Sequence, residues 1–133
     1  MKRLIFMLFA LCLVLTACGG NISNTQRIYA ASMYHTEAEI ESAMDVALEH
    51  FAREFEGCTM TSIRYEESRN GLSASEWAQQ YGDTQGIVLI SSFHVGPSGG
   101  DGSLNPNSTY NNWKWILTKS NDGEWILRTW GYG

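Results

Sequence analysis

The chain has 133 residues, and its nine Lys and Arg against fourteen Asp and Glu give a formal net charge of −5 at pH 7. An acidic chain with no basic cluster is unsuited to nucleic acid, which needs Lys and Arg against its phosphates. Anionic lipid head groups are excluded as a main partner for the same reason. The length suits one small domain with a modest core.

The first residues have the pattern of an export signal. Lys2 and Arg3 precede an apolar run over residues 4–14, which is long enough for a secretory signal and shorter than the roughly 20 residues that cross a bilayer. The sequence LTAC, residues 15–18, resembles the bacterial lipobox. The resemblance implies that residues 1–17 are removed, that Cys18 carries fatty acyl chains such as palmitate, and that the protein is anchored in the cell envelope, facing the extracytoplasmic side. Two acyl chains on one residue make such anchoring stable.

Cleavage at this point would leave residues 18–133. The mature chain would lose Lys2, Arg3 and Cys12, so its formal charge would be −7, and Cys58 would have no cysteine to pair with once Cys18 is acylated. We expect Cys58 to be a small buried residue rather than a reactive thiol. Residues 18–33 lack apolar periodicity and are predicted to be the lipidated cysteine and a flexible tether, so that a single domain occupies residues 34–133.

The domain is predicted to begin with an amphipathic helix. Thr36 and Glu39 have the spacing of a capping box, and Gly57 stands where the helix should end. Acidic residues occupy the face predicted to be solvated. The apolar positions of the opposite face are Ile40, Met44, Leu48, Phe51 and Phe55.

Four strands and a short second helix are predicted to follow. Residues 58–66 are rich in strand-forming side chains, and residues 87–95 are apolar on both faces, which is typical of a central strand. Between them, Ser73 and Glu76 indicate a second capping box, opening a short helix. Residues 110–118 and 124–130 flank an Asp-Gly turn and are predicted to form a hairpin.

This order predicts an α+β fold in which an N-terminal helix packs on a curved antiparallel sheet of about four strands, with one short extra helix. From residue 36 to 131 the order resembles the cystatin-like and SnoaL-like α+β cone folds. With the lipobox, the run GGDGSLNPNSTYNNWKWIL and the ending TWGY are similar to a group of small lipoproteins of Gram-positive bacteria. That group has no established activity to carry over.

The loop from residue 96 to 109 is longer than a hairpin needs and is predicted to be a contact surface. Asp101, Ser103, Asn105 and Asn107 place oxygen atoms at alternate positions, as in a calcium loop, but Pro106 stands where that loop turns on glycine. We therefore predict Asx turns and no metal or other cofactor. Asp101, Asn105 and Asn107 are candidate contacts for a ligand or a partner.

His94 and Trp130 are the other candidate contacts. In a cone fold an inward histidine paired with an aspartate acts as a general acid or base, and Asp101 and Asp83 are the nearest candidates for that carboxylate. The run GPSGG matches a nucleophile elbow, but no histidine and no helix follow it. Trp130 has the parity of Ile126 in its strand and is predicted on the face away from the main helix, in an aromatic patch or cup.

The sequence predicts an exported, lipid-anchored envelope protein that acts as a binding or accessory module through its curved sheet and the 96–109 loop. Its partners would be the membrane, through Cys18, and a small ligand or an envelope protein, but not nucleic acid. One alternative is a small cone-fold enzyme using His94 in a cup, although no catalytic set is evident. The other is an inhibitory or interaction lipoprotein that recognises another envelope protein.

Overall fold

The computed structural model describes residues 19–132, so the lipobox and Cys18 lie outside the described residues. Within that range the chain forms an α+β fold of two helices and one five-stranded sheet. The described residues contain no helix long and apolar enough to cross a membrane. The elements in chain order are β1 (Gln26–Ile28), α2 (Glu37–Glu54), β2 (Cys58–Tyr65), the 3-10 turn η2 (Glu67–Arg69), α3 (Leu72–Gln80), β3 (Gln85–Val95), β4 (Thr109–Lys119) and β5 (Ile126–Tyr132).

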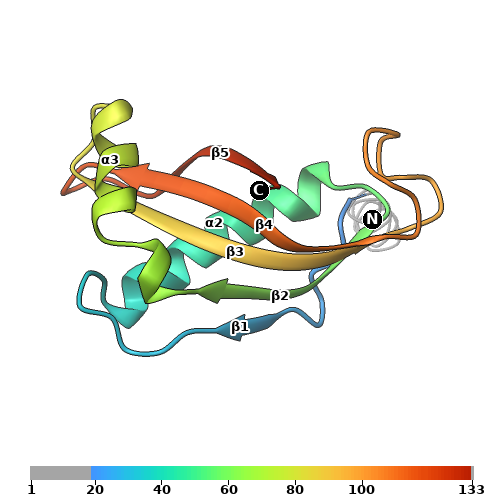
Figure 1. The fold of residues 1–133 in the computed structure, drawn as a ribbon, viewed down its shortest axis with the longest axis horizontal. Coiled ribbons are helices and arrows are strands. Elements are labelled where there is room, and N and C mark those ends of the chain that lie inside the picture. Colours follow the sequence, from blue (N-terminus) through green and yellow to red (C-terminus); the bar gives the residue numbers. More distant parts are fainter. Residues whose placement is uncertain (1–18, 133) are drawn as a thin grey trace, which may run out of the picture.

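The sheet keeps chain order from β1 to β5 and is antiparallel except between β1 and β2. Figure 1 shows α2 lying along one face of the curved sheet, and α3 at one end. The 96–109 loop and the start of the described chain lie at the other end. The sheet is open, with β1 and β5 as its edges.

The helix α2 begins and ends where the sequence predicts. The Thr36 hydroxyl accepts a hydrogen bond from the Glu39 amide at 3.2 Å, and the Glu39 carboxylate accepts one from the Thr36 amide at 3.1 Å. Gly57 has a φ of +74°, which turns the chain out of the helix into β2. The predicted capping box is therefore confirmed.

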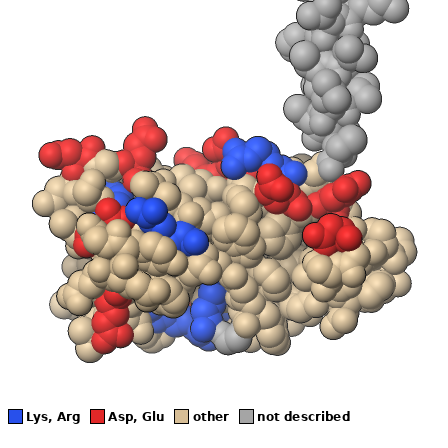
Figure 2. Space-filling model, turned by 90° about the horizontal axis from the view of Figure 1, so that it is seen from above, with Lys and Arg blue, Asp and Glu red and all other residues tan. Residues whose placement is uncertain are grey.

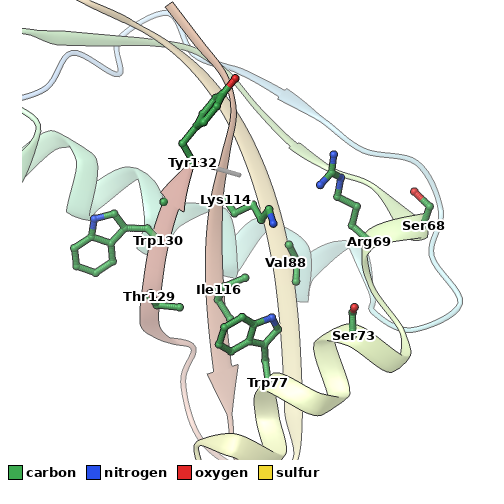
Figure 3. A pocket seen from close by; sticks show the side chains of 11 residues that line it. Ser68, Arg69, Ser73, Trp77, Val88, Lys114, Ile116, Thr129, Trp130 and Tyr132 are labelled. Carbon is green, nitrogen blue, oxygen red and sulfur yellow. The ribbon is translucent and has the colours of Figure 1, made fainter. Parts of the chain in front are cut away.

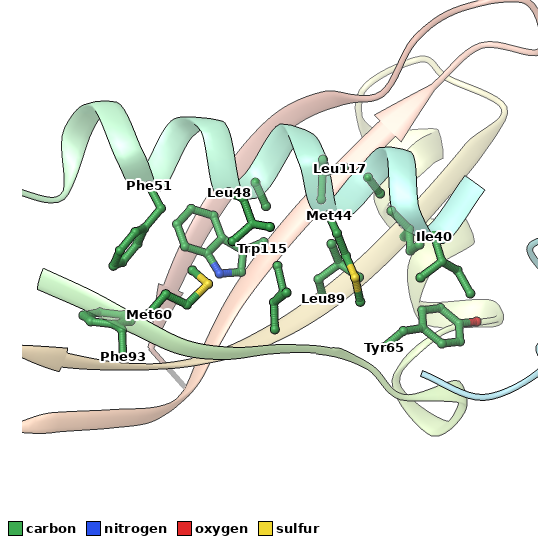
Figure 4. Close-up of a cluster of buried hydrophobic side chains, with 14 of the residues drawn as sticks. Ile40, Met44, Leu48, Phe51, Met60, Tyr65, Leu89, Phe93, Trp115 and Leu117 are labelled. Carbon is green, nitrogen blue, oxygen red and sulfur yellow. The ribbon is translucent and has the colours of Figure 1, made fainter. Parts of the chain in front are cut away.

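The sheet buries side chains on both faces. The larger cluster lies between α2 and the sheet, where Met44 and Phe51 of α2 meet Leu89 and Trp115 of the strands (Figure 4). Each such side chain contributes about 1.5–3 kcal/mol on burial. A smaller cluster lies under α3 on the other face and contains Ala74, Val88, Ile90 and Ile116. The strand β3 is covered on both faces, as its continuous apolar run predicts.

The strand β1 lies in the segment that we expected to be a tether. Its residues are exposed, and its pairing with β2 is parallel, so the sheet has five strands and is mixed. Arg27 forms an ion pair with Asp45 at 2.7 Å, which means that the acidic face of α2 is partly covered. Main-chain hydrogen bonds and ion pairs hold this edge strand, so it needs no apolar periodicity, and the sequence pattern did not reveal it.

The predicted capping box at the second helix is wrong. The helix α3 begins at Leu72, after Gly71, and no side chain caps it. The preceding Asn70 fixes this start, because its side-chain amide accepts from the Val88 amide at 2.9 Å and donates to the Val88 carbonyl at 3.1 Å. Gly71, with φ +77°, then redirects the chain directly into the helix.

The predicted position of Trp130 is also wrong. The pairing of β4 with β5 steps from Leu117–Leu127 to Ile116–Thr129, so the intervening Arg128 is a bulge. Arg128 bonds instead to Asp83 and to Thr118, both at 2.9 Å. The extra residue reverses the side-chain parity and turns Trp130 to the face of α2, opposite Trp115.

Candidate functional site

A cavity of about 420 Å³ lies at the loop end of the molecule, between the last turn of α2, the 96–109 loop and the strands β4 and β5. We call it the α2-end cavity. Its walls contain four aromatic or imidazole rings, two carboxylates and the buried thiol of Cys58. These residues are His50, Phe55, Trp113, Trp130, Glu54, Asp101 and Cys58.

The rings of the α2-end cavity meet at steep angles. Phe55 and Trp113 are 5.9 Å apart between centroids with an interplanar angle of 88°, and His50 and Phe55 are 6.2 Å apart at 68°. Trp130 lies 4.3 Å from the His50 ring at 52°. Rings arranged this way enclose a concave space rather than a flat stack.

Two ring nitrogens in these walls are buried without a hydrogen-bond partner: His50 Nε2 and Trp113 Nε1. Burial lowers the pKa of His50, the nearby charge of Arg53 adds to this effect, and the charge of Glu54 opposes it. The imidazole is therefore neutral at pH 7. A buried polar group left unpaired costs about 1–3 kcal/mol, so the packing of these two rings lowers the stability of the fold at this end.

Two carboxylates of the α2-end cavity have no cationic partner. Glu54 and Asp101 are exposed, and neither forms an ion pair within residues 19–132. Hydrogen bonds from Ser103 lower the pKa of Asp101, which therefore stays ionised. Burial raises the pKa of the Cys58 thiol, and the charge of Asp101 adds to this effect. Cys58 is therefore a buried, protonated thiol, as the sequence predicts.

The 96–109 loop is held in one conformation by its own hydrogen bonds. Asp101 accepts from the Ser103 amide at 3.0 Å, which is the predicted Asx turn. The Asn105 amide donates to the Tyr110 hydroxyl at 3.2 Å, and the Asn107 amide donates to the Gly96 carbonyl at 3.1 Å. The loop therefore presents a fixed wall to the cavity.

The structure brings together some of the predicted contact residues and separates others. Asp101 and Trp130 line the α2-end cavity, whereas Asn105 and Asn107 are exposed on the loop and do not line it. His94 is exposed on the opposite face, where its Nδ1 lies 3.2 Å from the Thr109 hydroxyl. The predicted contact residues therefore do not form one site, and their contact with a ligand or a partner stays a prediction.

The carboxylates considered for His94 have other partners. Asp83 accepts hydrogen bonds from Arg128 and Thr118, and Asp101 accepts from Ser103. Among the described residues, no group of three or more His, Cys, Asp and Glu is placed to hold a metal ion.

A second hollow of about 480 Å³ lies on the other face, beside α3. Figure 3 shows Trp77, Val88 and Ile116 in this α3-side groove, with Trp130 pointing away from it. Lys114 also lines the groove, as does Arg69, which is bonded to Glu66 at 3.0 Å. This groove is the uncovered second face that the sequence predicts; Trp130 also lines it from β5, so this residue borders both hollows, although its indole lies on the side of α2.

Sequence reasoning missed three residues of the α2-end cavity. His50 and Glu54 are four residues apart at the end of the apolar stripe of α2, so they share a side of the helix, and that spacing was the available signal. Trp113 has the parity of the buried Trp115 and packs against the core, but parity does not tell whether the indole N–H has a partner.

Comparison with known proteins does not identify a family. No family model, no curated protein and no solved structure matches the chain. The function is therefore inferred from the residues and their geometry.

Proposed function

We propose that the protein is exported, anchored by lipid at Cys18 on the extracytoplasmic side of the cell membrane, and binds a small ligand in the α2-end cavity. The observation that carries the binding proposal is the cavity itself, a concave space of about 420 Å³ lined by the rings of His50, Phe55, Trp113 and Trp130 and by two carboxylates. Ligand sites are typically concave and apolar, with a few polar groups that fix orientation.

The lipid anchor and the cavity would lie at the same end of the domain. The Gly20 amide donates to the Ala52 carbonyl at 3.0 Å, so the chain enters the described structure beside the last turns of α2. Ala52 is two residues from both His50 and Glu54, which line the cavity. A lipid on Cys18 would therefore hold the cavity close to the bilayer surface.

The anchor is tested by fractionation of cells that produce the wild type or Cys18→Ser. We expect the wild type in the membrane fraction with a mass increased by acyl chains, and the variant without that mass. A wild type that carries no acyl chain would overturn the anchor and leave the binding proposal untouched.

Ligand binding is tested by native mass spectrometry of the protein as expressed, released from membranes in a nonionic detergent. We expect an added mass that is lost on denaturation and is reduced in Trp130→Leu, which opens the aromatic wall. The matched control is Trp77→Leu, which alters the α3-side groove instead. An added mass lost only from the Trp77 variant would move the site to that groove.

Recognition of an envelope protein is the second candidate, and the free edge of the sheet favours it. The strand β5 is an edge strand within the described residues, and Ile126, Trp130 and Tyr132 along it are exposed by 48%, 42% and 62%. Exposed edges accept an added strand from a partner. Cross-linking from position 126 in whole cells, with position 76 as the control, would identify such a partner.

The finer fold assignment also remains a proposal. A long helix lying on a curved, largely antiparallel sheet supports the likeness to cystatin-like and SnoaL-like cones and to small Gram-positive lipoproteins. The enzyme alternative has less support, because His94 faces away from the α2-end cavity and bonds to Thr109 rather than to a carboxylate. Retention of function in His94→Ala would remove that alternative.

A further inference from the structure

We propose that the α2-end cavity binds an organic ammonium ion, with the cationic group held by the aromatic walls and by the carboxylates of Glu54 and Asp101. This inference rests on the proposed function, in that it names the class of ligand that the same cavity takes. It follows from the aromatic walls of the cavity and from the negative charge around them. That charge also disfavours anionic ligands.

The walls match what a quaternary ammonium group needs. Such a group carries a diffuse positive charge and an apolar surface, and aromatic rings attract it through their electron-rich faces. Trp113, Phe55 and His50 line the cavity and pack against one another edge to face, so together they form a continuous aromatic wall. Trp130 continues the wall from β5.

The charge around the cavity is negative. Glu54 and Asp101 line it without ion-pair partners among residues 19–132. The cavity also lies at the carboxyl end of α2, an 18-residue helix whose aligned peptide dipoles favour a cation at that end. Figure 2 shows acidic side chains at both ends of the molecule, including the end that carries the 96–109 loop in Figure 1.

Anionic ligands fit this cavity poorly. Arg53 directly precedes the cavity residue Glu54 in the sequence. It does not line the cavity, and it bonds to Glu49 at 3.0 Å. An anion would therefore face two carboxylates with no compensating charge. A metal ion is also disfavoured, since no group of three ligating side chains is assembled within residues 19–132. A neutral ligand would leave the two carboxylates unused.

The ammonium group could belong to a free small molecule or to a lipid head group. The second source is reasonable because the chain enters the domain beside Ala52, which would put the cavity next to the bilayer if Cys18 carries lipid. Both sources share the same recognition chemistry, and the experiment below separates them.

The test uses calorimetric titration of the protein in nonionic detergent with choline and with 3,3-dimethyl-1-butanol, its uncharged counterpart of the same shape. We expect choline to bind in the millimolar range or tighter, and the alcohol to bind at least about tenfold more weakly. The double variant Glu54→Gln, Asp101→Asn should bind choline about tenfold more weakly with no change for the alcohol. Glu76→Gln on α3 is the matched control and should change neither.

The outcomes separate the inference from the function on which it rests. Equal binding of choline and the alcohol, with both lost in Trp130→Leu, would overturn the ammonium inference and leave the cavity as a ligand site. No binding of choline would also overturn the ammonium inference. The presence or absence of an added mass in native mass spectrometry would then decide whether the cavity is a ligand site. Choline binding unaffected by both the carboxylate and the Trp130 variants would place the cation elsewhere and overturn the inference.

Two membrane conditions distinguish the source. The protein is reconstituted in nanodiscs of phosphatidylglycerol, with or without phosphatidylcholine, and titrated with free choline. Weaker binding in the presence of phosphatidylcholine means that the head group competes for the cavity. Equal binding in the two membranes means that the cavity takes the free cation.

Discussion

The two ends of the molecule treat their polar side chains differently. At the α3 end, Asp83 bonds to Arg128 and Thr118, and Asn70 bonds to both main-chain groups of Val88. At the loop end, the ring nitrogens of His50 and Trp113 are buried without partners, whereas the other end has one such atom among the described residues, His35 Nδ1 beside Tyr65 and Trp125. Glu54 and Asp101 in the same cavity have no cation to pair with in residues 19–132.

The indole N–H groups of the tryptophans also differ in whether they have a hydrogen-bond partner. The indole of Trp115 donates to the Ser91 hydroxyl at 2.8 Å, and that of Trp125 donates to the Glu39 carbonyl at 3.0 Å. Trp113, two residues before Trp115 on β4, has no such acceptor. Two buried indoles of this fold are therefore satisfied, and the one beside the cavity is not.

The largest effect on stability is expected at the α3 end. Asn70→Ala would leave both the amide and the carbonyl of Val88 without a partner in a buried position, which should lower the free energy of unfolding by about 3 kcal/mol. Urea unfolding measures this, with the exposed Asn111→Ala as control. A loss in Asn70→Ala no greater than in the control would mean that this end is not held by its polar contacts.

A smaller difference is expected between two tryptophans. Trp125→Phe removes an N–H that donates to the Glu39 carbonyl and so loses one hydrogen bond, whereas Trp113→Phe removes an N–H that has no partner. Both lose similar ring area, so Trp125→Phe should be less stable than Trp113→Phe by about 1 kcal/mol in urea unfolding. Equal losses would show that the Trp113 indole has a partner in solution.

The pH dependence contributed by His50 should differ from that contributed by Asp83. The pKa of His50 is lowered from its ordinary value of 6.5, mainly by burial, so the unfolded chain binds the proton more readily and stability falls as the pH drops below 6.5. Hydrogen bonds from Thr118 and Arg128 lower the pKa of Asp83 from 3.8, so its contribution is complete above pH 3.8 and is lost as the pH falls below that value.

Two variants separate these contributions in thermal unfolding at several pH values. His50→Leu should lose less stability than the wild type between pH 7 and 5, where His35, whose pKa is also lowered by burial, still titrates in both proteins. The stability of Asp83→Asn should depend on pH differently from that of the wild type only as the pH falls below 3.8. A His50→Leu profile parallel to that of the wild type over this interval would contradict the burial of the imidazole.

The smallest effect is expected for the surface ion pair at the loop end. Arg53 and Glu49 are both exposed, and such pairs contribute less than about 0.5 kcal/mol. Arg53→Ala should therefore leave urea unfolding almost unchanged, while removing a positive charge near the cavity should tighten choline binding slightly. A large loss of stability would show that this pair holds the end of α2.

The sequence predicts the regular part of this fold well. The helix α2 is marked by its capping box and its apolar period, and β3 by an apolar run that suits a strand buried on both faces. Three features depend on long-range contacts that no local pattern encodes. The strand β1 is held by main-chain bonds to β2, α3 begins where Asn70 bonds to β3, and the bulge at Arg128 follows from its bonds to Asp83 and Thr118.

The candidate site was harder to predict than the fold. The length and composition of the 96–109 loop marked it and Asp101 as candidates, and strand parity marked Trp130. The bulge in β5 then changed which face Trp130 occupies, and with it the location of the cavity. His50 gave no motif, because its role depends on the absence of a partner, which only the packed structure reveals.

The most direct test follows the five indole N–H signals of the ¹⁵N-labelled protein by NMR while choline is added, with each signal assigned by a Trp→Phe variant. Binding in the α2-end cavity should shift the Trp113 and Trp130 signals and leave those of Trp77 and Trp125 in place. A shift confined to Trp77 would place the ligand in the α3-side groove, and no shift at Trp113 or Trp130 at saturating choline would contradict the proposed site.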